Sequence, residues 1–180
     1  MFESGEAHTG LRLNGARLAG ERLRMAELRD CHLTDCDLSN AEWEHCRLEE
    51  VVLQGCRLTG FRLANCRGVE VALRDCQARY LQIERCKLED VRFERCQLTE
   101  STLMGSELVR AVLTECDLAG AVLSGSRLRH ADLRGCGFGG IRASIDDLAG
   151  AILDPEQAAA VLMGEAGIRV LPLGVDPDGG

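Results

Sequence analysis

Apolar residues recur at every fifth position along most of the chain. Counting by five from Leu13 to Phe138, 20 of the 26 positions are Leu, and three of the others are Trp43, Ile83 and Phe93. An α-helix turns about 100° per residue, so apolar residues five apart would be spread around the helix instead of lining one face. The pattern therefore excludes a helix for this part of the chain.

A second apolar position lies two residues before each of these centres, and we call it the leading slot. From residue 11 to residue 136 it holds Ala, Cys, Val, Ser, Leu or Phe everywhere except at Glu21, and only Gly68 and Ala78 interrupt the central slot. Side chains two residues apart in an extended chain point to the same side. Each unit is therefore expected to be a very short strand whose leading and central side chains face a core.

The fifth position of each unit predicts a corner. It is Gly, Asn or Asp in 15 of the 26 units, and these residues tolerate the positive φ of tight turns. Short strands joined by regular corners can bury their apolar side only by stacking on one another, which predicts a solenoid. Val51, Val71 and Val91 recur every 20 residues in the leading slot, which indicates four units per coil.

The units CDLSN at 36–40, CDLAG at 116–120 and ADLRG at 131–135 stand close to the repeat A(D/N)LXX. Over about residues 11–140 the chain resembles the pentapeptide-repeat family. The resemblance implies an all-β solenoid, a right-handed quadrilateral parallel β-helix. This hand agrees with the general rule for parallel crossovers.

The sequence after the repeats predicts a C-terminal helix over about residues 155–165. Asp154 is placed as N-cap, Pro155 at the first helical position and Gln157 at the third. The helix is apolar on more than one side, and in similar family members such a helix pairs two rods, so we expect a homodimer. A short strand is expected around residues 168–170. The candidate dimer interface is Ala158, Val161, Leu162, Met163, Ile168 and Val170.

The opposite end of the rod is less regular. Glu21 places a charge in a leading slot, so the first coil is expected to be open or incomplete. The expected division of the chain is an N-terminal cap at 1–10, a β-helix at 11–145, a capping and dimerisation segment at 146–171, and a flexible tail at 172–180.

All ten cysteines occupy leading slots, at a spacing that does not gather four thiolates as a zinc site requires. We expect them to be free, packed thiols. His8, His32, His45 and His130 are expected on the surface, outside the inward slots. No Ser or Cys can be matched to a His and a carboxylate, and no Gly-rich phosphate loop is present. The sequence therefore predicts no catalysis, no cofactor and no metal.

Charge and hydropathy argue against a membrane or a nucleic acid as the partner of this chain. The polar, acidic N-terminus and the absence of a run of 18 apolar residues predict no export signal and no membrane span, so a cytoplasmic location is expected. The formal net charge of −8 argues against a protein that binds nucleic acid directly. A protein partner is the remaining expectation.

The resemblance also suggests which partner. One group of pentapeptide-repeat proteins binds DNA gyrase or topoisomerase IV through a rod that resembles B-DNA, and protects against quinolones or other gyrase poisons. This chain is similar to that group in its uninterrupted rod, its length and its C-terminal helix. However, residues 11–140 hold 20 acidic and 19 basic residues, so the rod body is a poor copy of the charge of DNA.

One acidic column can be identified. Corner residues one coil apart should stack, and six acidic residues share this region of the rod, which we call the acidic stripe: Asp30, Glu49, Glu50, Glu70, Glu89 and Asp90. The stripe is either a binding surface or a solvated face balanced by neighbouring Arg and Lys. Three functions therefore remain open: a topoisomerase-binding protein that confers resistance or self-immunity, a scaffold or adaptor for another protein, and a thiol-rich buffer for metal or oxidants.

Overall fold

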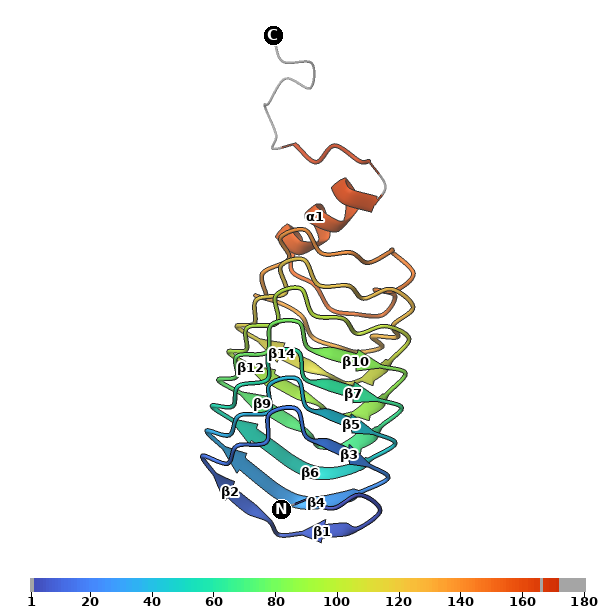
Figure 1. Ribbon diagram of the computed structural model, residues 1–180. Helices are drawn as coiled ribbons and strands as arrows, with labels where there is room; N and C mark the ends of the chain where they lie inside the picture. Colours follow the sequence, from blue (N-terminus) through green and yellow to red (C-terminus); the bar gives the residue numbers. More distant parts are fainter. Residues whose placement is uncertain (1, 166, 172–180) are drawn as a thin grey trace.

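The structure, a computed structural model, describes residues 2–165 and 167–171. Its strands are parallel and each pairs with the strand one coil further along the chain, as in Ala7↔Glu27 and Cys31↔Val51. Each coil therefore contains four five-residue units, and the coils stack along one axis with the helix α1 (Pro155–Glu165) at the C-terminal end (Figure 1). This confirms the right-handed, four-sided parallel β-helix that was expected.

The strands lie on three of the four sides of the rod. The first side holds β1 (Ala7–Thr9), β4 (Glu27–Thr34), β6 (Arg47–Gln54), β8 (Arg67–Val69), β11 (Lys87–Glu89) and β13 (Glu107–Val109). The second side holds β2 (Arg12–Asn14), β9 (Ala72–Arg74), β12 (Arg92–Glu94) and β14 (Val112–Thr114), together with the second halves of β4 and β6. The fourth side holds β3 (Arg22–Arg24), β5 (Glu42–Glu44), β7 (Arg62–Ala64) and β10 (Gln82–Glu84).

The third side is held by single bridges, such as Arg17↔Asp37, instead of strands. Beyond β14 all the sides are held in this way. The same register, one coil per step, continues to the bridge Asp132↔Ile152. The expectation of a short strand in every unit was therefore wrong for the third side, where turns leave only one bridging residue in each unit.

Leading and central side chains fill the interior of the rod. Every leading residue from Ala26 to Cys136 is buried. The aromatic rings of Trp43 and Phe61 meet edge to face with their centroids 5.1 Å apart. Burying a Leu side chain contributes about 1.5–3 kcal/mol, so the central Leu ladder is a large part of the driving force for stacking.

The corner residues adopt a left-handed backbone conformation whether or not they are glycine. Tyr80 and Arg95 have φ of 59° and 51°. The corner amides are satisfied by the next coil, since the Asp35 N–H donates to the Gln54 carbonyl at 2.9 Å. Stacking therefore overrides the local preference for glycine at these corners.

The N-terminal end differs from the expectation. Register begins at Ala7, inside the segment that was expected as a cap. His8 is half-buried in a central slot, opposite Leu28, so the prediction that it lies outside the inward slots was wrong. Phe2 closes the end, with its ring centroid 5.7 Å from that of Trp43. Glu21 is exposed at this open end, because the coil below it is incomplete.

The C-terminal end begins later than expected, because the bridge to Ile152 extends the rod past residue 145. The helix α1 has the predicted bounds and a reciprocal cap: Gln157 N–H donates to Asp154 Oδ1 at 2.9 Å, and Asp154 N–H donates to Gln157 Oε1 at 3.0 Å. Gln157 Nε2 also donates to the Leu133 and Cys136 carbonyls, which fastens α1 to the last coil. Residues 167–171 form no strand, contrary to expectation, and the expected tail lies outside the described residues.

Candidate protein-binding surface

The acidic stripe lies along one corner of the rod. Asp30, Glu50, Glu70 and Asp90 occupy the same corner in four successive coils, with φ between 49° and 56°. Neighbouring coils in a β-helix are about 4.8 Å apart, so these carboxylates stand in one column. Glu49 and Glu89 lie one residue before the corner, on the edge of the first side.

The ends of the column are neutralised and its middle is not. Asp30 pairs with Arg12 at 2.9 Å, and Asp90 pairs with Arg110 at 2.8 Å. Arg110 also contacts Glu89 at 2.7 Å, and Glu49 pairs with Arg29 at 3.0 Å. Glu50 and Glu70 are exposed and form no ion pair within the described residues.

Charges on the rest of the rod mostly alternate from coil to coil. Acid and base in the same slot of neighbouring coils then pair across the stack, as in Arg22–Glu42, Arg24–Glu44, Arg57–Asp37, Arg74–Glu94, Arg95–Asp75 and Arg127–Glu107. Like charges directly opposite each other on neighbouring strands are destabilising. Glu50 and Glu70, stacked between Asp30 and Asp90, are therefore one place where the rod departs from this alternation, and Arg47, Arg67 and Lys87 are another.

The middle of the stripe is flanked by two depressions. On the second side a groove of about 530 Å³ runs along the column, and its floor includes Val52, Ala72 and Val112. On the first side a hollow of about 280 Å³ lies over Gly68 and Val69. Glu50 and Glu70 line both depressions, so their carboxylates stand on a ridge between them.

Comparison with known proteins identifies the repeat. A model of the pentapeptide repeat region matches residues 26–103, and a model of eight pentapeptide repeats matches residues 106–140. The chain belongs to the pentapeptide-repeat family. No curated protein matches it in sequence.

Several solved pentapeptide-repeat structures are similar at low identity. Full-length QnrB1, a plasmid-mediated fluoroquinolone resistance protein, is 18% identical over 90% of this chain and 100% of QnrB1, with a TM-score of 0.35. Rfr23 from the cyanobacterium Cyanothece is 18% identical over 84% of this chain and 90% of Rfr23, with a TM-score of 0.28. HetL from the cyanobacterium Nostoc, involved in heterocyst differentiation regulation, is 19% identical over 83% of this chain and 87% of HetL, with a TM-score of 0.24.

All ten cysteines of this pentapeptide-repeat rod are buried and free. Each thiol points inward and contacts backbone carbonyls: Cys56 Sγ lies 3.3 Å from the Leu33 oxygen and 3.4 Å from the Gln54 oxygen. Burial raises the pKa of the Cys36 thiol, and a hydrogen bond with Cys66 together with burial raises the pKa of Cys46. Because all ten are buried, these thiols are suited to packing, since a reactive cysteine needs an accessible thiolate.

Within the described ranges no group of three His, Cys, Asp or Glu side chains could hold a metal ion. His45 and His130 are exposed and His32 is half-buried, as surface residues. In residues 2–165 and 167–171, the helical structure falls short of the length and apolarity that a membrane crossing requires.

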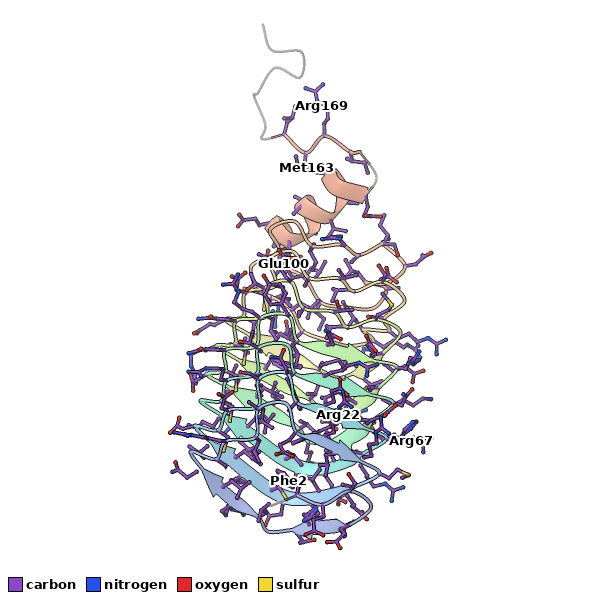
Figure 2. All side chains as sticks on the ribbon, viewed as in Figure 1. Phe2, Arg22, Arg67, Glu100, Met163 and Arg169 are labelled. Atoms are coloured by element: carbon purple, nitrogen blue, oxygen red, sulfur yellow. The ribbon has the colours of Figure 1, made fainter. Side chains whose placement is uncertain are left out.

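The candidate dimer residues gather at the C-terminal end but differ in exposure. Val161 is buried against the last coil, and Ala158 and Leu162 are half-buried. Met163, Ile168 and Val170 are exposed. Met163 lies on α1, beyond the last coil (Figure 2).

The rod should lose stability in acid as its stacked ion pairs are broken. The Arg95 guanidinium lowers the pKa of Asp75, and Arg110 lowers that of Asp90. An Asp whose pKa is lower in the folded chain than in the unfolded chain stabilises the fold when the pH is above its unfolded pKa of about 3.9. This contribution is lost as the pH falls through the folded-state pKa. We expect the Tm, followed by circular dichroism, to fall below about pH 4.

A pair of variants tests that cause. Arg95→Gln should flatten the decline of the Tm in acid. Without the Arg95 guanidinium, the ionised Asp75 carboxylate stabilises the fold less, so its protonation costs less stability. Arg79→Gln is the control, since Arg79 lies over the Tyr80 ring and forms no ion pair in the described part of the chain. Equal acid profiles for the two variants would contradict the assignment.

Sequence reasoning missed part of the surface. Arg110 occupies the next corner of the same column and neutralises its end, and the period of one coil could have shown this. The two depressions could not be read from the period. They depend on how the neighbours of Ala72 and Gly68 pack, which only coordinates show.

Proposed function

We propose that this chain is a non-enzymatic binding protein that occupies the DNA-binding saddle of DNA gyrase or topoisomerase IV and protects the enzyme against topoisomerase poisons. The observation that supports this best is the exposed, unpaired Glu50 and Glu70 on a ridge of a rod in which most charged residues form ion pairs. Their carboxylates would take the place of DNA phosphates. No cofactor takes part.

The distribution of net charge also supports a saddle contact. Residues 11–140 are nearly neutral, with 20 acids and 19 bases, whereas residues 1–10 carry −2 and residues 141–180 carry −5. A two-fold dimer through the C-terminal end would bring two such acidic segments together at its middle. A symmetric topoisomerase could then contact the middle and both stripes.

We propose the homodimer from the apolar surface at this end. Ile145, Ile152, Met163 and Ile168 are between 45% and 53% exposed. A cleft of about 590 Å³ opens between α1 and the last coil, over Phe138 and other residues of that coil. A second copy would cover this surface, which a monomer leaves in water.

Met163→Asp should convert the dimer into monomers of 19.6 kDa in light scattering. The charge would be buried at the interface without a partner, which costs several kcal/mol. Leu162→Asp should act in the same way, although Leu162 is half-buried and also supports α1. Met104→Asp is the matched control, because Met104 is 51% exposed on the rod body and Met163 is 52% exposed. A dimer that persists in Met163→Asp would remove α1 from the interface.

A supercoiling assay tests the proposed function. Purified protein should inhibit DNA gyrase at micromolar concentration, or restore supercoiling in the presence of a gyrase poison. If it does neither with gyrase or topoisomerase IV, the topoisomerase role is refuted.

One observation favours the alternative of a scaffold for another protein. The rod pairs most of its charges and is a poor match to the charge density of duplex DNA. A scaffold would use the same flat sides with a different partner. It would leave supercoiling unaffected in both assays.

A further inference from the structure

Gly68 is a glycine for reasons of packing, not of backbone conformation. It stands in a central slot, where most units carry Leu, and its φ is not in the left-handed region. A Cβ at this position would lie 2.9 Å from Leu88 Cδ2, 3.1 Å from Val71 Cγ2 and 3.4 Å from Leu48 Cβ. Neighbouring side chains therefore fill the space, and the backbone of β8 lies too close to the core to carry a side chain.

The outer surface is hollowed at the same place. The hollow of about 280 Å³ is lined by Arg47, Leu48, Glu49, Glu50, Arg67, Gly68, Val69 and Glu70, and we call it the Gly68 hollow. Its floor is apolar, and Val69 is 43% exposed on it. Ligand pockets for drug-sized molecules start at about 300 Å³, so this hollow suits one side chain or a short segment.

Opposite charges stand on the two rims of the hollow. Arg47 and Arg67 form one rim, and Glu50 and Glu70 form the other. Arg67 and Glu70 are three residues apart in one coil, which is about 10 Å in extended chain. Arg67, Glu50 and Glu70 form no ion pair within the described ranges, although most charged residues of the rod pair across the coils. Figure 2 shows Arg67 at the edge of the rod.

We propose that the Gly68 hollow is a docking site for an extended protein segment that carries a basic and an acidic residue two positions apart. The aliphatic stem of the basic side chain packs on Val69 and Gly68, while its cation lies between Glu50 and Glu70. The acidic side chain pairs with Arg67. The site requires only this pattern of charges, so it does not depend on the partner being a topoisomerase.

Three features favour this occupant. The two rims carry unlike charges, which complement a segment with both signs better than a purely basic one. The rims are about 10 Å apart, a separation that two long side chains on one face of an extended segment can span, because their Cα atoms lie about 7 Å apart and the side chains can splay outward. The hollow is shallow and apolar at its floor, like the anchor positions that dominate protein interfaces.

The test uses the full chain and a capped pentapeptide, Gly-Lys-Val-Glu-Gly, followed by amide chemical shifts in ¹H–¹⁵N spectra. We expect saturable shifts at Gly68 and Val69, and binding at least about fivefold weaker when the peptide Lys or Glu is replaced by Gln. Absence of saturable shifts at these amides would overturn the proposal. Equal binding of the Gln peptides would overturn it too, since it would show that the charges on the rims are not used.

A matched pair of variants locates the site. Val69→Arg fills the hollow from its floor and should weaken peptide binding at least about fivefold. Val109→Arg is the control, because Val109 occupies the same slot two coils further along, in β13. Unchanged binding in Val69→Arg, with an otherwise unchanged spectrum, would overturn the proposal. Supercoiling assays of both variants test the topoisomerase role separately from peptide binding. If the parent chain binds the peptide but has no effect on supercoiling, the docking site stands and the proposed topoisomerase role does not.

Discussion

A protein carrying Glu50→Lys and Glu70→Lys should lose at least about tenfold of its effect on DNA gyrase in the supercoiling assay. These two carboxylates are the unpaired acids of the stripe, and lysine would place cations where the topoisomerase saddle offers cations to DNA. A contact between like charges in an interface costs several kcal/mol of binding free energy, and about 1.4 kcal/mol corresponds to a tenfold change in affinity.

The same double variant should fold at least as well as the parent chain. Glu50 and Glu70 stack on each other and on Asp30 and Asp90, so reversal of both charges makes the contacts with Asp30 and Asp90 attractive and leaves one repulsive contact, between positions 50 and 70. Lysine meets the same backbone cost as glutamate at a corner of positive φ. We therefore expect an equal or higher Tm together with the loss of function. Such a combination points to a surface kept for binding at some cost in stability.

Glu100→Lys is the control for charge reversal outside the stripe, with half the change in net charge of the double variant. Glu100 occupies a corner with φ of 57°, two corners further round the coil from Asp90, and forms no ion pair in the part of the chain that the structure describes. It should leave gyrase inhibition within about twofold of the parent. An equal loss in Glu100→Lys would mean that the effect is not specific to the stripe. Full activity of the Glu50→Lys and Glu70→Lys protein would exclude the stripe.

No thiol of the native protein should react with an aromatic disulfide reagent within minutes, and all ten should react after unfolding in guanidinium chloride. The thiols are at most 6% exposed, and Cys136 is the one that reaches this value. Reaction requires a thiolate at the surface, so it must wait for local or global opening of the stack.

Cys136 should be the first thiol to react as denaturant is raised, because it lies in the last coil under α1. Gln157→Ala removes the side chain that bonds to the Cys136 carbonyl and should hasten this first reaction. Cys56 lies in the middle of the rod and serves as the internal control. Rapid reaction of several native thiols would instead favour the alternative of a thiol buffer.

Most of the rod could be predicted because its fold repeats one local rule. A residue such as Leu88 is central because it stands five residues from Ile83 and Phe93, and the structure buries all three. The helix α1 was also predictable, since its cap at Asp154 is a local pattern. The same register extends beyond the expected boundaries, to Ala7 at one end and Ile152 at the other, whereas the strand expected around residues 168–170 does not form.

The surface was predictable only in part. The positions of charged residues follow from the repeat period, but the depressions between them do not. The column at Glu50 and Glu70 follows from their spacing of one coil. The Gly68 hollow depends on Leu48 and Leu88 closing over an absent side chain, and the sequence marks Gly68 only as an exception. Whether such an exception leaves an internal void or draws the backbone inward is decided by the packing of its neighbours.

Because each coil contains four units, each unit turns the chain by a quarter turn about the axis of the rod. Insertion of one unit between Asp90 and Asp154 would rotate everything downstream by a quarter turn, while insertion of a whole coil would lengthen the rod and preserve every direction. In an end-to-end dimer, the number of units between the stripe and α1 therefore sets whether the two stripes look the same way or at right angles. Homologues that vary in length should do so in steps of whole coils wherever both stripes must meet a single partner.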